Sequence, residues 1–333
     1  MIQKPGYGFI TLVLGGLFWF ATPASAADTI LILHNKNIAM PAKSVFREAM
    51  EGIYENLEGT VNVFEFPLLE ETSLEETRIY LDVVNPDLVI LMGNQAIHKY
   101  RIYQIFSGRH IFPPAVVLME VFVQRDVERL TNAVGIEYQV QAVTSLNHFR
   151  NVFPGTKRVG VIYRNETAEF FLEQQKQCRE EKVELVGIEV GKNHQVTPRA
   201  VRRALKRLAQ REKVQAIWIL NDNVLLTSKI LREAWMRSLG RYDLPTIVGI
   251  RRFFAEEEFA NLGHFAVVPE PHGVGMQAAD LVLAIRANGW KILETKIYPP
   301  ISIQKFLNRR KLPHSLSATL DSDKLLELDK VLE

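Results

Sequence analysis

Three short polar residues stand together at the end of an apolar run. Asn221, Asp222 and Asn223 follow AIWIL and precede a segment with helical spacing. A carboxylate and two amides at such a turn fit two interpretations. They can close the turn and cap the helix, or they can hold a small polar solute where strand ends and helix starts meet. Asp222 is the leading candidate for a solute contact.

A second polar turn has the same form. In RVGVIYRNETAEFFLEQ a strand is expected to end at Tyr163 and a helix to begin at Thr167. Asn165 begins a formal glycosylation sequon, and Asn165 or Thr167 can also cap the helix. Because the free N–H groups of a helix start also attract the polar end of a ligand, we expect Tyr163 and Asn165 to line a binding cleft.

Further candidates follow other apolar runs. They are Gly93, Asn94 and Gln95 after LVILM, His34 and Asn35 after TILIL, and Arg251 after TIVGI. Gly93 would allow close backbone approach, and Asn94 would cap the next helix. An inward-pointing Arg251 would grip a carboxylate or phosphate through two hydrogen bonds. This suggests the hypothesis that the ligand carries an anionic group.

Motifs of common catalytic and cofactor sites are missing from the sequence. H-E-x-x-H, G-x-S-x-G and the P-loop pattern do not occur, and the 8 histidines show no metal-site spacing. GVGMQA, residues 273–278, matches G-x-G-x-x-A but lacks the complete βαβ unit around it, so turn glycines explain it better. We therefore expect no cofactor, no metal and no enzymatic activity.

Short apolar runs alternate with helical patterns along the chain. The expected strands are Thr29–Leu33, Val61–Phe66, Leu88–Met92, Ala115–Met119, Val134–Tyr138, Arg158–Tyr163, Glu184–Val190, Ala216–Leu220, Thr246–Ile250 and Phe265–Val268. Several are apolar throughout, which is typical of parallel strands covered by helices on both faces. The alternation predicts an α/β fold, repeated in two similar halves.

Composition is ordinary for a globular protein. The chain has 333 residues, 47% hydrophobic and 23% charged, with a net charge of +2. That length favours two lobes, and the charge gives no general case for binding nucleic acid or anionic membranes. The single cysteine, Cys178 in QKQCREEK, excludes an intrachain disulfide and is expected to face solvent.

The N-terminus has the pattern of a cleavable secretory signal peptide. Lys4 precedes the apolar run Phe9–Ala21, and Ala24-Ser25-Ala26 forms a small-residue cleavage site. The run is shorter than the ~20 apolar residues that span a bilayer. Residues 1–26 are thus expected to be removed, leaving the mature chain in the periplasm.

The order of several segments resembles a known family. PGTKRVGVIYRNETAEFFLEQQKQCREEKVELVGIEV, PDLVILMGNQAIHKY, AIWILNDNVLLTS, LPTIVGI and HGVGMQAADLVLAIRANGW resemble successive parts of the uncharacterised ABC-transporter substrate-binding proteins with the type I periplasmic-binding fold. The similarity covers nearly the whole mature chain. Where that family commonly has an Asp-Pro pair, this chain reads MEVFVQRD, which makes Glu120 a further candidate site residue.

The resemblance implies two Rossmann-like lobes with parallel sheets flanked by helices, joined by three hinge strands that close on a ligand. The expected boundaries are 27–133 plus 269–292 for the N-terminal lobe, 134–268 plus 293–301 for the C-terminal lobe, and 302–333 for a tail with a surface helix. In the family, the acidic residue corresponding to Asp222 faces the ligand, where it would grip an amine or hydroxyl.

The same resemblance implies a monomer that captures a small polar, anionic or amino-acid-like solute for an ABC permease in the inner membrane. Two alternatives stay open: a sensory module that reports the ligand to a membrane receptor or kinase, and, least favoured, an exported enzyme. No nucleic-acid partner is expected.

Overall fold

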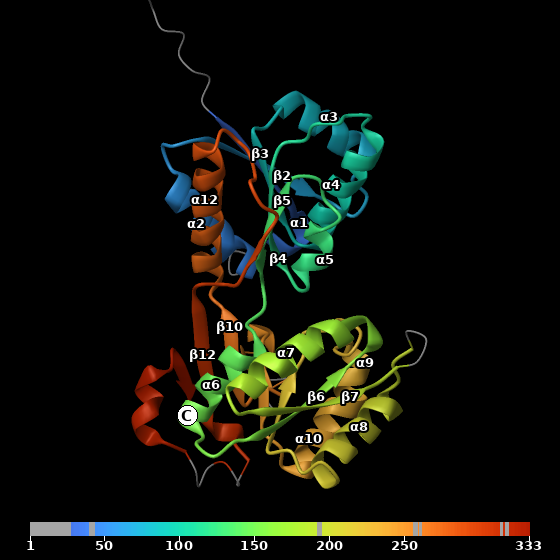
Figure 1. Cartoon of the computed structure of the whole chain (residues 1–333), viewed down its shortest axis with the longest axis vertical. Helices are drawn as coiled ribbons and strands as arrows, with labels where there is room; N and C mark the ends of the chain where they lie inside the picture. The colour runs from blue at the N-terminus through green and yellow to red at the C-terminus, as the bar shows by residue number, and fades with distance from the viewer. Residues whose placement is uncertain are drawn as a thin grey trace, which may run out of the picture.

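The computed structural model describes residues 28–39, 44–191, 195–255, 259, 262–313, 316 and 320–333. The predicted signal peptide, residues 1–26, lies outside them. Among the described residues, none of the helices combines the length and apolar character that crossing a membrane requires. Figure 1 shows two lobes, one above the other, joined along one side.

The first lobe is built on a six-stranded sheet in the order β11-β5-β4-β3-β1-β2, paired in parallel throughout. Its strands are β1 (Thr29–Asn35), β2 (Asn62–Leu68), β3 (Leu88–Met92), β4 (Ala115–Glu120), β5 (Ala133–Glu137) and β11 (Ile297–Tyr298). Helices α2 (Val45–Leu57) and α12 (Pro271–Ala287) pack on one face. Helices α3 (Leu74–Val84), α4 (Asn94–Phe106) and α5 (Val123–Val127) pack on the other, and the short α1 (Lys36–Ala39) follows β1.

The second lobe has a seven-stranded sheet in the order β13-β12-β10-β9-β8-β6-β7, in which only β10 and β12 pair antiparallel among the described strands. Its strands are β6 (Arg158–Tyr163), β7 (Glu184–Glu189), β8 (Ala216–Ile219), β9 (Thr246–Val248), β10 (Phe265–Pro269), β12 (Ile303–Asn308) and β13 (Lys330–Leu332). Helices α6 (Ala142–Val152) and α7 (Ala168–Glu180) cover one face. The other is covered by α8 (Pro198–Gln210), α9 (Ser228–Ile230), the π-helical turn η2 (Leu231–Trp235), α10 (Met236–Tyr242) and α11 (Arg251–Ala255).

The predicted α/β class with two parallel-stranded lobes is confirmed, but the lobe boundaries differ. Strand β5 was expected to open the second lobe, yet it pairs with β4 in the first sheet. Strand β11 was also assigned to the second lobe and instead pairs with β5. The predicted tail differs in the structure: residues 303–308 and 330–332 are strands, the 3-10 turns η4 (Arg309–Lys311) and η5 (Ser322–Glu327) lie between them, and Leu316 is helical.

Three hinge segments connect the lobes: residues 138–141, residue 270 and residues 299–302. Hydrogen bonds tie the third segment to the second segment and to helix α12. The Glu270 N–H donates to the Ser302 carbonyl at 3.0 Å, and Gln277 Nε2 donates to the Pro299 carbonyl at 3.0 Å. Because the chain crosses at one side only (Figure 1), the opposite side is where the lobes can separate.

Helices α2 and α12 approach each other closely through glycine. A Cβ on Gly275 would lie 1.9 Å from the Ala49 carbonyl oxygen, and one on Gly52 would lie 2.1 Å from the His272 carbonyl oxygen. Glycines 273 and 275 of the GVGMQA segment lie within helix α12 rather than in a turn. Gly275 permits the close packing of the two helices, and Gly273 leaves room for Ser302 of the third hinge segment, 2.6 Å from where a Cβ would lie.

Candidate functional site

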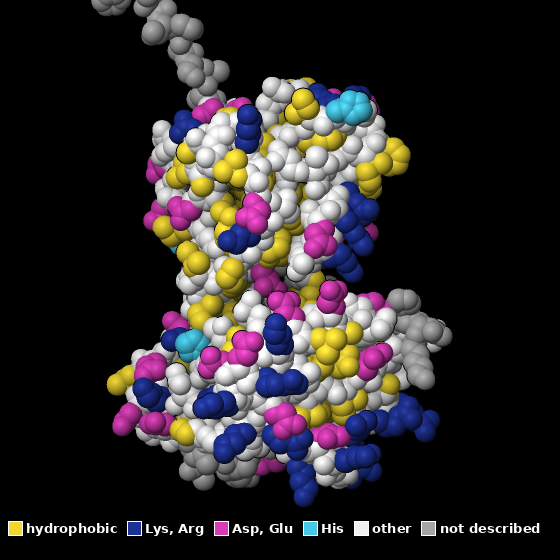
Figure 2. All heavy atoms as spheres, viewed as in Figure 1, with side chains coloured by type: hydrophobic (Ala, Val, Ile, Leu, Met, Phe, Trp, Pro, Cys, Tyr) yellow, Lys and Arg dark blue, Asp and Glu magenta, His cyan; other side chains and the backbone are white. Residues whose placement is uncertain are grey.

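A cavity of about 580 Å³ opens between the lobes. Both lobes contribute to its walls, at the carboxyl ends of β4, β5 and β8 and around the start of α7. Figure 2 shows acidic side chains gathered at this waist of the molecule. We call it the cleft cavity. Its size falls in the range of small-molecule sites, which is about 300–1,000 Å³.

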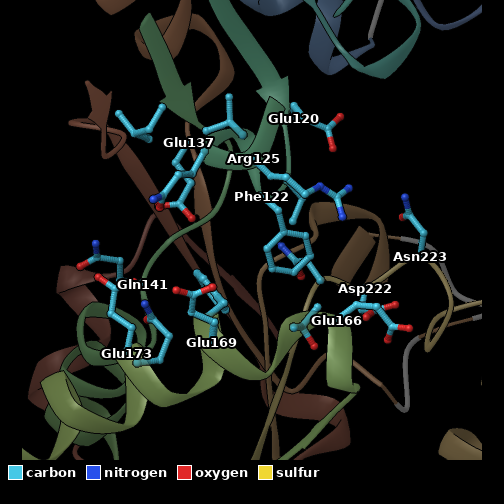
Figure 3. A pocket seen from close by; sticks show the side chains of 18 of the residues that line it. Glu120, Phe122, Arg125, Glu137, Gln141, Glu166, Glu169, Glu173, Asp222 and Asn223 are labelled. Carbon is cyan, nitrogen blue, oxygen red and sulfur yellow. The ribbon is translucent and has the colours of Figure 1, made fainter. Parts of the chain in front are cut away.

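The first lobe presents Glu120 and Phe122 on an irregular stretch after β4. The β4–β5 register shifts between Val117 and Glu120, and Met119 and Phe122 adopt φ values of 61° and 62°. Such left-handed backbone is costly for residues other than glycine and is concentrated at functional sites. It turns Glu120, only 9% exposed, and Phe122 toward the cavity (Figure 3).

The second lobe contributes the first turns of α7. Glu169 and Glu173 are four residues apart, so they share one face of the helix. Phe170 contacts Phe122 of the opposite lobe edge to face, with ring centroids 5.3 Å apart. Figure 3 shows Glu137 on the upper wall and Glu169 and Glu173 on the lower wall.

Arg164 and Asp222, which both line the cleft cavity, form a buried ion pair. Arg164 Nε donates to Asp222 Oδ2 at 2.7 Å, and Arg164 Nη1 donates to Glu166 Oε2 at 2.9 Å. The second oxygen of Asp222 accepts the Val224 and Leu225 N–H groups at 2.8 and 3.1 Å. Asp222 is therefore already satisfied by a guanidinium and two backbone donors, and its position fixes the turn and Arg164.

Two other carboxyl groups of the cleft cavity lie where the charged form is disfavoured. Burial raises the pKa of Glu120 to about 7, with a further contribution from Asp126. Burial also raises the pKa of Glu137 to about 7, assisted by the charge of Glu173 on the opposite lobe. The Val121 N–H and the Asn94 side chain, both neutral donors, hydrogen-bond Glu120, and the charge of Arg125 offsets part of the rise in its pKa. A bound cation would relieve this cost.

No metal site stands out. Within the described part of the chain, no group of three or more His, Cys, Asp or Glu side chains is arranged to hold a metal ion. The carboxylates of the cleft cavity are instead spread over both walls.

Comparison with protein families and with curated proteins gives no match. Solved structures do match. A ligand-free, open substrate-binding protein with adhesive properties from Clostridium difficile aligns over 92% of this chain and 99% of its own, with a TM-score of 0.61 and 14% identity. An ABC domain in complex with L-Trp from Streptococcus pneumonia aligns over 92% and 100%, with a TM-score of 0.54 and 14% identity. A periplasmic ribose ABC transporter protein from Conexibacter woesei aligns over 85% and 93%, with a TM-score of 0.51 and 14% identity.

The chain has the type I periplasmic-binding fold. This conclusion rests on the two lobes, on the three-segment hinge and on a match over almost the full length of each neighbour. At 14% identity the likeness shows the fold and does not transfer a ligand.

The periplasmic-binding fold brings five of the twelve predicted site residues to the cleft cavity. These are Asn94, Glu120, Asn221, Asp222 and Asn223. The other seven do not line it: Tyr163, Asn165, Gly93, Gln95, His34, Asn35 and Arg251. Several of these have structural contacts instead. Tyr163 stacks on Phe171 with centroids 4.3 Å apart, His34 Nε2 lies 3.1 Å from Glu65 Oε2, and Gln95 bonds Asn35 and the Leu69 carbonyl.

The predicted anion grip at Arg251 does not fit its surroundings. Arg251 lies outside the cleft cavity and pairs with Glu48 of the first lobe at 2.9 Å. Its neighbour Arg252 lies over the Phe259 ring, 5.1 Å from the centroid. The arginine pair therefore offers no basis for an anionic ligand group.

Sequence reasoning missed most of the charged lining. The missed residues include Arg125, Glu137, Arg164, Glu169 and Glu173. A signal existed for two of them: Arg164 stands inside the polar turn RNET, and Glu137 is the last but one residue of an expected strand. No signal in the sequence indicated that Glu169 and Glu173 line a cleft, because their exposure to it depends on how the lobes face each other.

Proposed function

We propose that this protein is an exported solute-binding protein that captures a small polar molecule between its lobes and delivers it to an ABC transporter in the membrane. The observation that carries the proposal is the cleft cavity, lined by polar side chains from both lobes at strand ends. The fold supports it, since the neighbours named above include a substrate-binding protein and ABC-transporter components. Capture then works by closure, because a ligand that touches both walls binds the closed form better.

A thermal-shift screen on the chain without residues 1–26 tests the capture step. Amino acids, amines, sugars, nucleobases and organic acids are each added in excess, and a ligand specific for the folded state raises the melting temperature by mass action. We expect one chemical class to raise it. If all classes leave it unchanged, solute capture is overturned.

Delivery needs a separate test. The liganded protein is added to membranes that contain the ABC transporter encoded beside it, and ATP hydrolysis is followed. We expect stimulation by the liganded protein only. Equal rates with liganded, ligand-free and no added protein would contradict the transport role.

A further inference from the structure

The charge of the cleft cavity is strongly one-sided. Its lining contains seven carboxylate residues and two arginines. The carboxylates are Glu120, Glu128, Glu137, Glu166, Glu169, Glu173 and Asp222, and the arginines are Arg125 and Arg164. One of the two guanidinium groups, that of Arg164, is already paired with Asp222 and Glu166.

The remaining carboxylates are poorly compensated by positive charge: Arg125 acts on Glu120 through its charge but forms no ion pair with it in the described part of the chain. Among the described residues, no ion pair is formed by Glu120, Glu137, Glu169 or Glu173; Glu173 accepts only a long hydrogen bond of 3.5 Å from Gln177. These four face the same space from opposite lobes (Figure 3). An anionic ligand entering this space would meet repulsion from both walls, whereas a cation would meet attraction from both.

Aromatic and apolar groups complete the lining. Phe122 and Phe170 contact each other at the cavity, and Ile297 and Pro299 lie at its edge. Aromatic faces attract ammonium groups through their negative π-surface. Apolar contacts also require a ligand with a carbon frame, which a simple metal ion lacks.

We infer that the solute is a small organic cation, with one or more protonated amino groups held by the glutamates of both lobes and a carbon frame packed against Phe122 and Phe170. This inference rests on the proposed function and assigns it a substrate class. Two classes of ligand have this chemistry. Aliphatic diamines carry only ammonium groups, and basic amino acids also carry a carboxylate, which would pair with Arg125.

Isothermal titration calorimetry with matched probes tests the charge requirement. Cadaverine is compared with glutarate and pentanediol, which have the same chain length with anionic and neutral ends. We expect binding of cadaverine alone, weakening as salt is raised because the attraction is screened. L-Lysine and L-arginine form a second arm. Tighter binding of L-lysine than of cadaverine supports the ammonium site and adds Arg125 as the carboxylate contact.

Charge-removing variants test the site. Glu137→Gln and Glu173→Gln each remove one charge from opposite walls with little change in shape. Each is expected to weaken cadaverine or lysine binding about tenfold to hundredfold, the range for losing a charged hydrogen bond. Glu180→Gln is the control, because Glu180 is exposed on the same helix α7 and does not line the cleft cavity. Equal affinities of all three variants would overturn the assignment.

The outcomes separate this inference from the function on which it rests. Binding of a sugar, glutarate or another solute without an amine, and none of the amines, overturns the organic cation but keeps solute capture. Binding of calcium or magnesium alone also overturns the organic cation. If no solute in the wider screen binds, the proposed function fails as well.

Discussion

At the scale of single residues, the main feature is the difference between Asp222 and the glutamates. Asp222 is fully satisfied by Arg164 and two backbone N–H groups, so its charge is compensated within the protein. Glu120 and Glu137 are held at the cleft cavity with pKa values raised to about 7, so their charges cost stability. Asp222 therefore shapes the site, whereas Glu120 and Glu137 are available to a ligand.

Asp222→Asn is expected to lower the free energy of unfolding by about 1–3 kcal/mol, since it removes one of the two charged partners of the buried Arg164 guanidinium and leaves only Glu166. Urea denaturation followed by circular dichroism measures this change. Glu184→Gln is the matched control, because the Arg158–Glu184 pair, 2.7 Å apart, is exposed and such pairs contribute about 0–1 kcal/mol. A larger loss from Glu184→Gln than from Asp222→Asn would contradict this interpretation.

Glu120→Gln is expected to stabilise the ligand-free protein at pH 8. The pKa of Glu120 is about 7 in the folded chain, above its unfolded value. The folded state therefore holds the proton more tightly and loses stability as pH rises from about 4.5 through 7. Removing the charge should gain about 1–3 kcal/mol at pH 8 and little at pH 4.

Urea denaturation at the two pH values measures the effect of Glu120→Gln. The groups beside this carboxyl are Asp126, Arg125 and Asn94. Glu180→Gln serves again as the control and should show no pH-dependent difference. A gain at pH 4 equal to that at pH 8 would exclude ionisation as the cause.

At the scale of elements, the α2–α12 contact depends on glycine. Gly275→Ala would place a Cβ 1.9 Å from the Ala49 carbonyl oxygen, so the helices must separate. We expect a loss of about 1–3 kcal/mol, the range for overpacking. Gly240→Ala in helix α10 is the control: nothing lies within 4 Å of its added Cβ, and alanine favours helix by about 1 kcal/mol. Thermal unfolding of both variants would show opposite shifts.

The hydrophobic periodicity of the sequence predicted most of these helices and strands, but it did not predict which elements pack against each other. Runs such as LVILM became strands buried on both faces, because continuous apolar sequence leaves few alternatives. Cys178 was expected to face solvent among charged neighbours, and it is instead buried against the second sheet, where burial raises its pKa to about 12. Polar Gln174 of the same helix is buried too, accepting the Ala142 N–H at 2.7 Å. That contact depends on the neighbouring helix α6.

At the scale of the whole molecule, the lobes touch through side chains as well as through the hinge. Arg251 of α11 pairs with Glu48 of α2 at 2.9 Å, and Phe122 meets Phe170. The resemblance to a known family predicted two lobes and a cleft, but the two halves of the sequence are too similar in pattern to show where each hinge segment runs. β5 and β11 were therefore assigned to the wrong lobe.

Arg251→Glu is expected to favour the open arrangement, because it would face Glu48 with a like charge. The ligand must then supply the extra work of closure, and apparent affinity falls with the closed fraction. For a partly exposed pair worth up to about 1 kcal/mol, we expect a loss of up to about fivefold. Small-angle scattering should show a larger radius of gyration. Arg309→Glu, which disrupts a pair with Glu333 within one lobe, should leave both quantities unchanged.

The glutamates that line the cleft cavity also act on its width. Glu137 belongs to the first lobe and Glu173 to the second, and the charge of Glu173 already disfavours ionisation of Glu137. Without a bound cation, the negative charges on the two walls repel each other and favour a wider cleft. Salt would screen this repulsion, and mild acid would protonate the glutamates, with no solute present. We therefore expect the ligand-free molecule to populate the closed arrangement more as salt rises or pH falls.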